Sequence, residues 1–257
     1  MGIFWVGFGL FPLGRGEAVG DENRIQPVRV AVSISIPPFF LKEREGGIEM
    51  DIIRQGFQLQ GIPVQPHFFR AAPRLDSYRN RQMDCASTVL KNSGLEGIYS
   101  QPVITMETVA ITLTQRAIGI NKIDDLKKYN ILAYQGAGQL LGTDFAAAVS
   151  DNRRYRERLK NELLPTMLYR NRVDVVLSDL TIFHYFRHKM ATRVDVEQPI
   201  TVHHILPPQD FHLVCHDAAQ IAAFDQGLMQ LRRSGGYQRI VEGYLQGDAL
   251  SDKEKVQ

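Results

Sequence analysis

The sequence predicts an α/β fold made of two lobes, each a mainly parallel sheet covered by helices. Strand patterns rich in β-branched residues alternate with amphipathic helix patterns from about Val28 onward. This alternation occurs twice, in units of about 100 residues, which is a normal size for a small domain or lobe. The composition agrees, because 44% of the 257 residues are hydrophobic, enough to build two cores.

The first unit has the order strand, helix, strand, helix, strand. Alternating apolar residues at 28–34 predict the first strand, and consecutive prolines at 37–38 must then leave regular structure. An apolar face at 51–60 predicts the first helix. The remaining elements are expected at 64–68 (strand), 73–81 (helix) and 83–88 (strand). Short crossovers of this kind favour parallel pairing.

The second unit begins with a strand at 108–114 and contains a glycine loop at 135–138. The arginines and glutamates of 153–162 have the spacing of a solvated helix face. The other predicted elements of this unit are a short helix from Ile123, a strand at 130–134, a helix through Ala148, a longer helix at about 153–169, a strand at 173–177 and a helix at 180–189. Strands at 201–206 and 211–215, a helix capped by Asp217 and a last helix at 237–245 complete the chain.

The first twenty residues differ from the rest. The apolar run 3–13 is too short to span a bilayer, which takes about 20 residues. It is typical of a secretory signal, with Ala18 and Gly20 as small residues at the cleavage point, although no Lys or Arg precedes it. The alternative is a buried N-terminal strand. We favour a signal peptide at residues 1–20 and therefore a periplasmic protein.

Charge and motifs exclude several classes of function. Thirty basic and 28 acidic side chains give a net charge of +2, without the basic surface that nucleic-acid binding requires. Cys85 and Cys215 either form one disulfide in an oxidising compartment or remain buried thiols. His184 and His188 have a zinc-compatible spacing, but no third ligand accompanies them. No Gly-x-Ser-x-Gly motif is present. We expect no metal, no cofactor and no enzymatic activity.

Several short stretches occur in an order that is characteristic of one family. They are Pro-Pro-Phe-Phe at 37–40 with the turn and helix start at 47–51, the helix end and Asp-led strand at 81–84, the Tyr-Ser-Gln-Pro turn at 99–102, Ile-Asp-Asp-Leu-Lys at 123–127 followed by a strand and the glycine loop, the strand segment 172–179, and the closing helix pair at 224–245 with its Ser-Gly-Gly-Tyr link. Together they span about 28–245. On these residues the chain resembles bacterial extracellular solute-binding protein family 3, receptors that supply polar amino acids to ABC transporters.

The resemblance implies the periplasmic binding protein type II architecture, two Rossmann-like lobes joined by two hinge strands. Lobe 1 would comprise residues 21–107 plus 200–257, and lobe 2, inserted in it, residues 108–199. The ligand would lie in the cleft between lobes that close by hinge motion. We expect the protein to be a monomer and to deliver its ligand to a membrane permease.

The resemblance also places candidate ligand-binding residues. Asp179 matches the carboxylate that holds the ammonium group of a ligand; alternatively it only caps the following helix. Phe39 and Phe40 would form an aromatic wall or pack in the core. The other candidates are Arg70, Lys91, Tyr134 and, in the glycine loop, Gly136.

The carboxylate end of the expected pocket departs from the family. No Arg stands between Arg81 and Arg116, where the family has the residue that binds the α-carboxylate, so Lys91 or Arg70 would have to replace it. Ala137 occupies a position at which the family often has Ser or Thr. We therefore expect an amine-bearing solute without standard α-carboxylate geometry. The alternatives are a ligand-sensing or accessory protein for a sensor kinase or periplasmic enzyme, and a dehydratase-like enzyme on the same fold.

Overall fold

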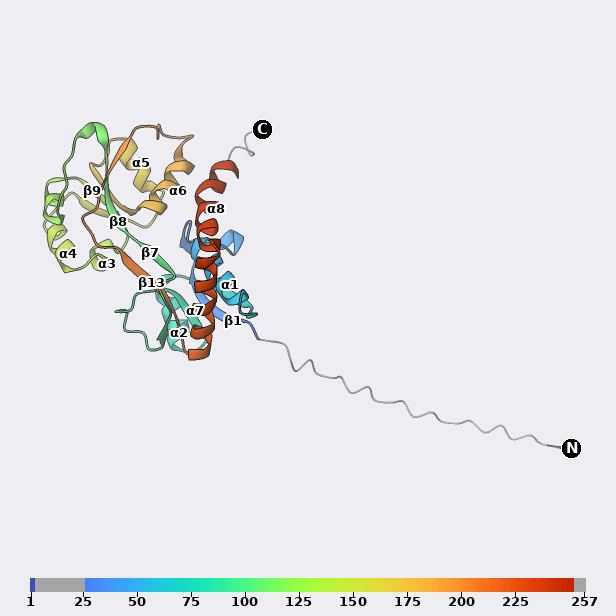
Figure 1. Ribbon diagram of the computed structural model, residues 1–257. Helices are drawn as coiled ribbons and strands as arrows, with labels where there is room; N and C mark the ends of the chain where they lie inside the picture. The colour runs from blue at the N-terminus through green and yellow to red at the C-terminus, as the bar shows by residue number, and fades with distance from the viewer. Residues whose placement is uncertain (3–25, 252–257) are drawn as a thin grey trace.

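The computed structural model describes residues 1–2 and 26–251. The predicted signal peptide and its cleavage point lie outside the described residues. The described chain forms two lobes, with lobe 2 at the upper left of Figure 1 and lobe 1 below it. Each helix in this part of the chain is too short or too polar to cross a membrane.

Lobe 1 is built on a six-stranded sheet with the order β4-β1-β5-β13-β6, and β7 also pairs with β13. β1 is parallel to β4 and β5, and β13 is antiparallel to β5. The strands are β1 (Val28–Ser33), β4 (Val64–Phe69), β5 (Cys85–Val89), β6 (Ile98–Tyr99), β7 (Ile104–Met106) and β13 (Gln209–Cys215), with a small hairpin of β2 (Ser35–Ile36) and β3 (Phe40–Leu41). The helices are α1 (Ile48–Gln58), α2 (Ala71–Arg79), α7 (Ala218–Arg233), α8 (Gly236–Ser251) and the 3-10 turn η1 (Lys42–Arg44).

Lobe 2 is built on a five-stranded sheet with the order β10-β9-β11-β8-β12. β9 is parallel to β10 and β11, whereas β8 is antiparallel to β11 and β12. The strands are β8 (Thr108–Leu113), β9 (Ile131–Tyr134), β10 (Tyr155–Arg158), β11 (Val175–Asp179) and β12 (Ile200–His203). The helices are α3 (Ala137–Leu140), α4 (Thr143–Ser150), α5 (Leu163–Tyr169), α6 (Leu180–Met190) and the 3-10 turns η2 (Thr114–Arg116) and η3 (Ile123–Lys128).

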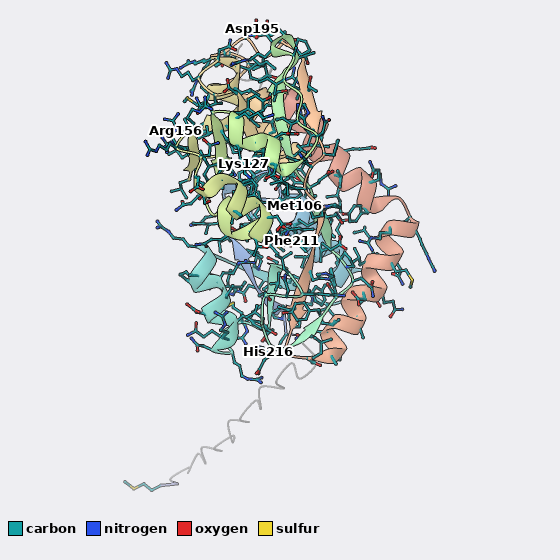
Figure 2. All side chains as sticks on the ribbon, turned by 90° about the vertical axis from the view of Figure 1, so that its left-hand side faces the viewer. Met106, Lys127, Arg156, Asp195, Phe211 and His216 are labelled. Carbon is teal, nitrogen blue, oxygen red and sulfur yellow. A yellow bond between two sulfur atoms is a disulfide. The ribbon has the colours of Figure 1, made fainter. Side chains whose placement is uncertain are left out.

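The chain crosses between the sheets twice. The first crossing is at Glu107, between β7 and β8, and the second is at 204–208, between β12 and β13. Met106 and Phe211 lie at the waist between the lobes, with Asp195 and His216 at opposite ends of the molecule (Figure 2). β12 belongs to the sheet of lobe 2, although the family resemblance implies that the chain returns to lobe 1 at residue 200. We therefore propose to place the second lobe boundary within 204–208.

A close contact between α1 and α7 organises the core of lobe 1. A side chain at Gly227 would overlap the carbonyl oxygen of Gly56, so these two glycines let the helices touch at the backbone. The Phe57 and Phe224 rings pack beside this crossing, with centroids 5.2 Å apart. The same core cluster includes Ile182 of α6, which is only 8% exposed. Since α6 also contacts α8, a helix of lobe 2 packs against the core of lobe 1.

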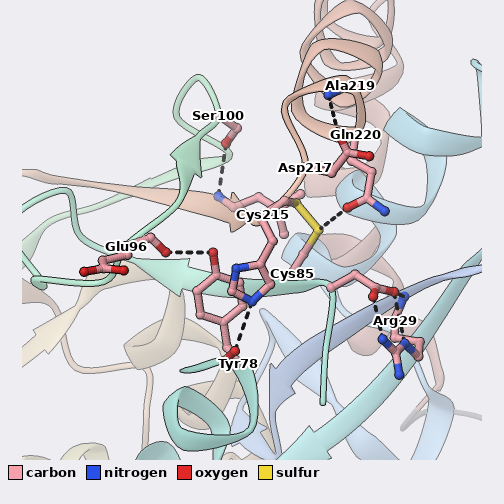
Figure 3. The surroundings of a disulfide bond; sticks show 12 residues. Arg29, Tyr78, Cys85, Glu96, Ser100, Cys215, Asp217, Ala219 and Gln220 are labelled. Carbon is pink, nitrogen blue, oxygen red and sulfur yellow. Dashed lines mark hydrogen bonds and ion pairs between the residues drawn. A yellow bond between two sulfur atoms is a disulfide. The ribbon is translucent and has the colours of Figure 1, made fainter. Parts of the chain in front are cut away.

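Cys85 and Cys215 form a disulfide between neighbouring strands (Figure 3). The two residues are directly paired across β5 and β13, and both are fully buried. The structure therefore has the disulfide rather than two free thiols. Beside it, the rings of Tyr78 and His216 stack with centroids 4.0 Å apart. Disulfides of this kind persist in oxidising compartments.

The long helix predicted at 153–169 is wrong. Residues 155–158 form β10, an edge strand paired with β9, and the helix α5 begins only at Leu163. The Arg and Glu residues therefore lie on the two faces of a strand, with Tyr155 and Glu157 half-buried and Arg156 and Arg158 exposed. The single helix predicted through Ala148 is instead α3 and α4, separated at Gly142, which has a φ of 91°. The other predicted helices and strands are confirmed to within three residues at each end, except that the last helix, predicted to end at residue 245, continues to Ser251.

Candidate functional site

The carboxyl ends of the parallel strands in both lobes lie next to the hinge. β8 begins just after the Glu107 crossing, and its first residue Thr108 pairs with Asp179, the last residue of β11. In lobe 1, β13 starts from the second crossing and pairs antiparallel with β5, so the end of β5 also lies near the hinge. Ligands of open α/β sheets bind outside these strand ends. The interlobe edges are therefore the candidate site.

Asp179 lies at the lobe 2 edge and is 9% exposed. Its Oδ1 accepts hydrogen bonds from the backbone N–H groups of Thr181 and Ile182, at 2.9 and 3.1 Å. Its Oδ2 accepts one from Glu107 N–H at the hinge, at 3.2 Å. Burial raises the pKa of the Asp179 carboxyl, and these donors only partly offset the rise. Asp179 is thus the N-cap of α6 and, at the same time, the link between α6 and the hinge.

Tyr134 lies beside Asp179 at the end of β9. Its hydroxyl is 3.3 Å from the hydroxyl of Thr108. Burial raises the pKa of Tyr134, and the negative charges of Glu157 and Asp179 add to the rise. Tyr134 is therefore within electrostatic reach of a carboxylate on each neighbouring strand, so the structure brings two of the predicted residues, Tyr134 and Asp179, together.

The glycine loop after β9 is held by Glu157 of β10. Glu157 Oε2 accepts the N–H of Gly136 at 2.7 Å, and its Oε1 accepts the N–H of Gly138 at 2.9 Å. The hydroxyl of Tyr155 donates to the same Oε1 at 2.7 Å. Burial opposes ionisation of Glu157, but the hydrogen bonds from Gly138, Tyr155 and Gly136 outweigh it and hold the pKa of Glu157 below its ordinary value. The N–H of Gly136, a predicted ligand donor, thus already has an acceptor.

The lobe 1 edge contains a buried pair of opposite charges. Glu49, fully buried, accepts hydrogen bonds from the N–H and the hydroxyl of Thr88, both at 2.9 Å. Thr88 has a φ of 54°, an uncommon value for a residue with a side chain. Arg74, 8% exposed, donates to the carbonyl of Ser87 and interacts electrostatically with Glu49. Burial raises the pKa of Glu49 to about 7.

The side chains of the remaining predicted residues of lobe 1 divide between the core and the surface. Phe39 and Phe40 are 4% and 0% exposed and belong to the core cluster, which is the packing role. Arg70 is exposed at the start of α2, and Lys91 is exposed two residues after β5. Each of the two cations is therefore open to solvent, and neither Phe ring is open to a ligand.

The two crossings are tied to each other by a hydrogen bond between side chains. His204 Nδ1 lies 2.6 Å from Glu107 Oε1, across the hinge. A second contact links the hinge to lobe 2, since the Gln209 side chain donates to the carbonyl of Leu140 at 3.3 Å. The first contact joins the second crossing to Glu107, whose N–H donates to Asp179, and the second joins β13 to the end of α3.

Residues 1–2 and 26–251 contain no group of three or more His, Cys, Asp or Glu side chains arranged to hold a metal ion. His203 and His204 point to different partners, Thr112 and Glu107. A pocket of about 490 Å³ lies at the other edge of the lobe 1 sheet, beside the disulfide. It is lined by Gln26, Pro27, Arg29, Gln65, Asp84 and Gln220.

Sequence reasoning missed Glu157 and Glu49. Glu157 was placed on a helix face, and only the alternation of Tyr155, Arg156, Glu157 and Arg158 indicates a strand. Glu49 stands next to the acidic start of α1, where a Glu ordinarily faces solvent. Its burial depends on Arg74 and Thr88, which are distant in sequence.

Comparison with known proteins supports the same architecture. No protein-family model matches the chain, and no curated protein sequence matches it. Solved structures match with high coverage. The GluR0 ligand-binding core in complex with L-glutamate has a TM-score of 0.66 at 15% identity and covers 86% of this chain and 98% of its own. The chain has the periplasmic binding protein type II fold.

Two other structures with the type II fold are informative. The arginine-, lysine-, histidine-binding protein ArtJ from Geobacillus stearothermophilus has a TM-score of 0.62 at 15% identity, covering 85% of this chain and 95% of its own. A histidine kinase sensor domain with similarity to periplasmic binding proteins has a TM-score of 0.66 at 13% identity, covering 86% and 97%. The predicted resemblance is thus confirmed at the level of the type II fold.

Proposed function

We propose that the protein is a periplasmic receptor that holds a small polar, amine-bearing solute between its lobes and delivers it to an ABC transporter. The observation that carries the proposal is the buried carboxylate of Asp179 at a strand end beside the hinge. The structures that share the fold include the GluR0 ligand-binding core in complex with L-glutamate and ArtJ, an arginine-, lysine-, histidine-binding protein. The disulfide supports an oxidising compartment such as the periplasm.

The chemistry of Asp179 suits an ammonium group. The backbone N–H groups of Thr181, Ile182 and Glu107 donate to the carboxylate of Asp179, and the Thr181 side chain also hydrogen-bonds to it. Because burial disfavours the ionised form of Asp179, a bound cation would stabilise it. The hydroxyls of Tyr134 and Thr108 lie at the same edge as further partners.

Arg70 and Lys91 are proposed partners for the other end of the solute. Both are exposed, and both follow strands that end at the lobe 1 edge. Hinge closure would bring this edge toward Asp179. Phe39 and Phe40 are not proposed as ligand contacts, since both are buried in the core.

Thermal-shift screening against amino acids, diamines, other amines and short peptides tests the proposal. A solute that binds only the folded state raises Tm by mass action. We expect a concentration-dependent rise with amine-bearing solutes, reduced in Asp179→Asn. The matched control is Asp174→Asn, because Asp174 lies on the strand segment before β11, next to Asn130 rather than the hinge. No rise with any amine-bearing solute would contradict the proposal.

A ligand-sensing module is the second candidate, favoured by the match to a histidine kinase sensor domain. The two functions differ in what the loaded protein changes. A transport receptor stimulates ATP hydrolysis by its permease complex in proteoliposomes, whereas a sensing protein changes the autophosphorylation rate of a kinase. Measuring both with the same solute distinguishes them.

A further inference from the structure

We propose that Glu157 is a specificity-determining residue, an internal carboxylate that excludes ligands carrying a carboxylate at the glycine loop and selects their decarboxylated amine counterparts. The inference rests on the proposed function, because it concerns the ligand class of the same cleft. It starts from three hydrogen bonds that one side chain accepts.

The carboxylate of Glu157 occupies the donors of the loop. Gly136 and Gly138 direct their N–H groups at Oε2 and Oε1, at 2.7 and 2.9 Å. Two backbone N–H groups that converge on one carboxylate are the usual means by which a loop binds an anion. Here the anion belongs to the protein, so a carboxylate of a ligand finds these donors taken.

Several neighbours hold Glu157 in this place. Glu157 pairs in register with Ala133 of β9, which fixes its backbone beside the strand that leads into the loop. The Tyr155 hydroxyl fixes the carboxylate from its own strand, at 2.7 Å. Gly138 permits the close approach, because a Cβ there would come within 3.3 Å of Oε1. Arg158 donates to the backbone carbonyl of Glu157 at 3.0 Å.

The resulting charge pattern favours cations. Glu157 on β10 and Asp179 at the end of β11 lie on the two strands that flank β9 and its last residue Tyr134, so this edge of lobe 2 carries two carboxylates. Like charges at short range repel in a partly desolvated site, whereas an ammonium group is attracted by both. A diamine or a guanidinium-bearing amine fits this pattern better than an amino acid, whose own carboxylate would face Glu157.

Matched pairs of probes that differ by one carboxylate test this inference. We would measure the Kd of agmatine against arginine, cadaverine against lysine and putrescine against ornithine by calorimetry. For the wild-type protein we expect the decarboxylated member of at least one pair to bind more than about tenfold tighter, a difference that calorimetry resolves easily. In Glu157→Gln, which keeps an acceptor oxygen but loses the charge, the preference should fall below about threefold.

Asp151→Asn is the control, since it removes one negative charge from an exposed position of the same lobe. It should keep the wild-type preference. If Glu157→Gln does not fold, the backbone amide signals of Gly136 and Gly138 in the wild-type protein decide. Signals that stay in place when the bound amine is added support an engaged Glu157, and large shifts of both overturn its role.

The possible failures are distinguishable. Tighter binding of the amino acid in every pair, or an unchanged preference in Glu157→Gln, overturns the role of Glu157 and leaves the proposed receptor function standing. If all six probes and every other amine-bearing solute fail to bind, both proposals fall.

Discussion

The carboxylate of Glu49 accepts both the backbone N–H and the hydroxyl of Thr88, each at 2.9 Å, from a position with no solvent exposure. This contact fixes the end of β5 at the lobe 1 edge. It also places a titratable group in the core, where burial raises the pKa of Glu49 from 4.5 to about 7.

Glu49→Gln should change how stability depends on pH. Folded Glu49 binds its proton more tightly than unfolded Glu49, so its contribution to stability is fully present below pH 4.5 and is lost as the pH rises through about 7. The full effect is on the order of 3 kcal/mol, at 1.36 kcal/mol per pKa unit. Gln does not ionise, so the Tm of Glu49→Gln minus the Tm of wild type should increase from pH 4.5 to pH 8. Glu43→Gln, at an exposed position, is the control. A difference that is constant with pH would show that Glu49 does not titrate in this range.

Variants of Asp179 should distinguish its role as the N-cap of α6, measured as stability, from its role in ligand binding, measured as affinity. Asp179→Asn keeps an oxygen for the N–H groups of Thr181 and Ile182 but turns an amide NH2 toward the Glu107 N–H, so its loss of stability should be about 1 kcal/mol. Asp179→Ala removes the acceptor of all three N–H groups and should lose more. Binding of the best amine found by screening should weaken by about tenfold or more in both variants. Urea unfolding and calorimetry measure the two effects. Unchanged affinity in Asp179→Asn would leave Asp179 with the capping role alone.

Ile182→Ser should favour the open arrangement of the lobes. Ile182 of α6 packs in the core cluster of lobe 1, and removing an Ile from water contributes about 1.5–3 kcal/mol. Without this contact, we expect a larger radius of gyration by small-angle X-ray scattering in the absence of solute. Ile182→Val keeps the contact and should resemble wild type. Equal radii for all three proteins would contradict a role of Ile182 in holding the lobes together.

Gly227→Ala should destabilise lobe 1. The added methyl group would overlap the carbonyl of Gly56 in α1, so the helices must separate at a cost of about 1–3 kcal/mol or more. Gly243→Ala in α8 is the matched control, because its new Cβ meets no atom within 4 Å. That variant should be neutral or up to about 1 kcal/mol more stable. Urea midpoints compare the two.

Reduction of the Cys85–Cys215 disulfide should lower stability. The bond joins residues separated by 130 positions, and loss of a native disulfide typically costs about 2–5 kcal/mol. Dithiothreitol should lower the urea midpoint of wild type to that of the Cys85→Ser, Cys215→Ser double variant, and leave that variant unchanged. Two titratable thiols in the oxidised wild-type protein would contradict the bond.

Much of the fold could be predicted because its signals are local. Alternating residues predicted β1, and the Pro-Pro pair and glycine turn placed its end. α1 nevertheless begins at Ile48 rather than at residue 51, since Gly47, with a φ of 121°, lets the chain turn directly against the backbone of Phe39. The helix start is therefore set by a packing contact that the sequence pattern does not contain.

The candidate site was only partly predictable. Asp179 was predicted from the resemblance to the family, and Tyr134 was predicted because it leads from a clear strand into the glycine loop. Glu157 was assigned to the wrong element, because a stretch as short as residues 155–158 is compatible with both helical and strand spacing, and only the pairing with β9 decides. Lys91 and Arg70 were predicted from their charge alone. The charge of a residue does not indicate burial, so the buried Glu49 and Arg74, which organise the lobe 1 edge, were not predicted.

The disulfide has a mechanical consequence for the whole molecule. β13 leaves the second crossing and is covalently fastened at its far end to the central strand β5, so it cannot tilt independently of lobe 1. Pro207 and Pro208, just before it, have fixed φ angles. We therefore expect rotation of one lobe against the other to use the backbone torsions of Glu107 and of residues 204–206, the positions joined by the hydrogen bond between Glu107 and His204.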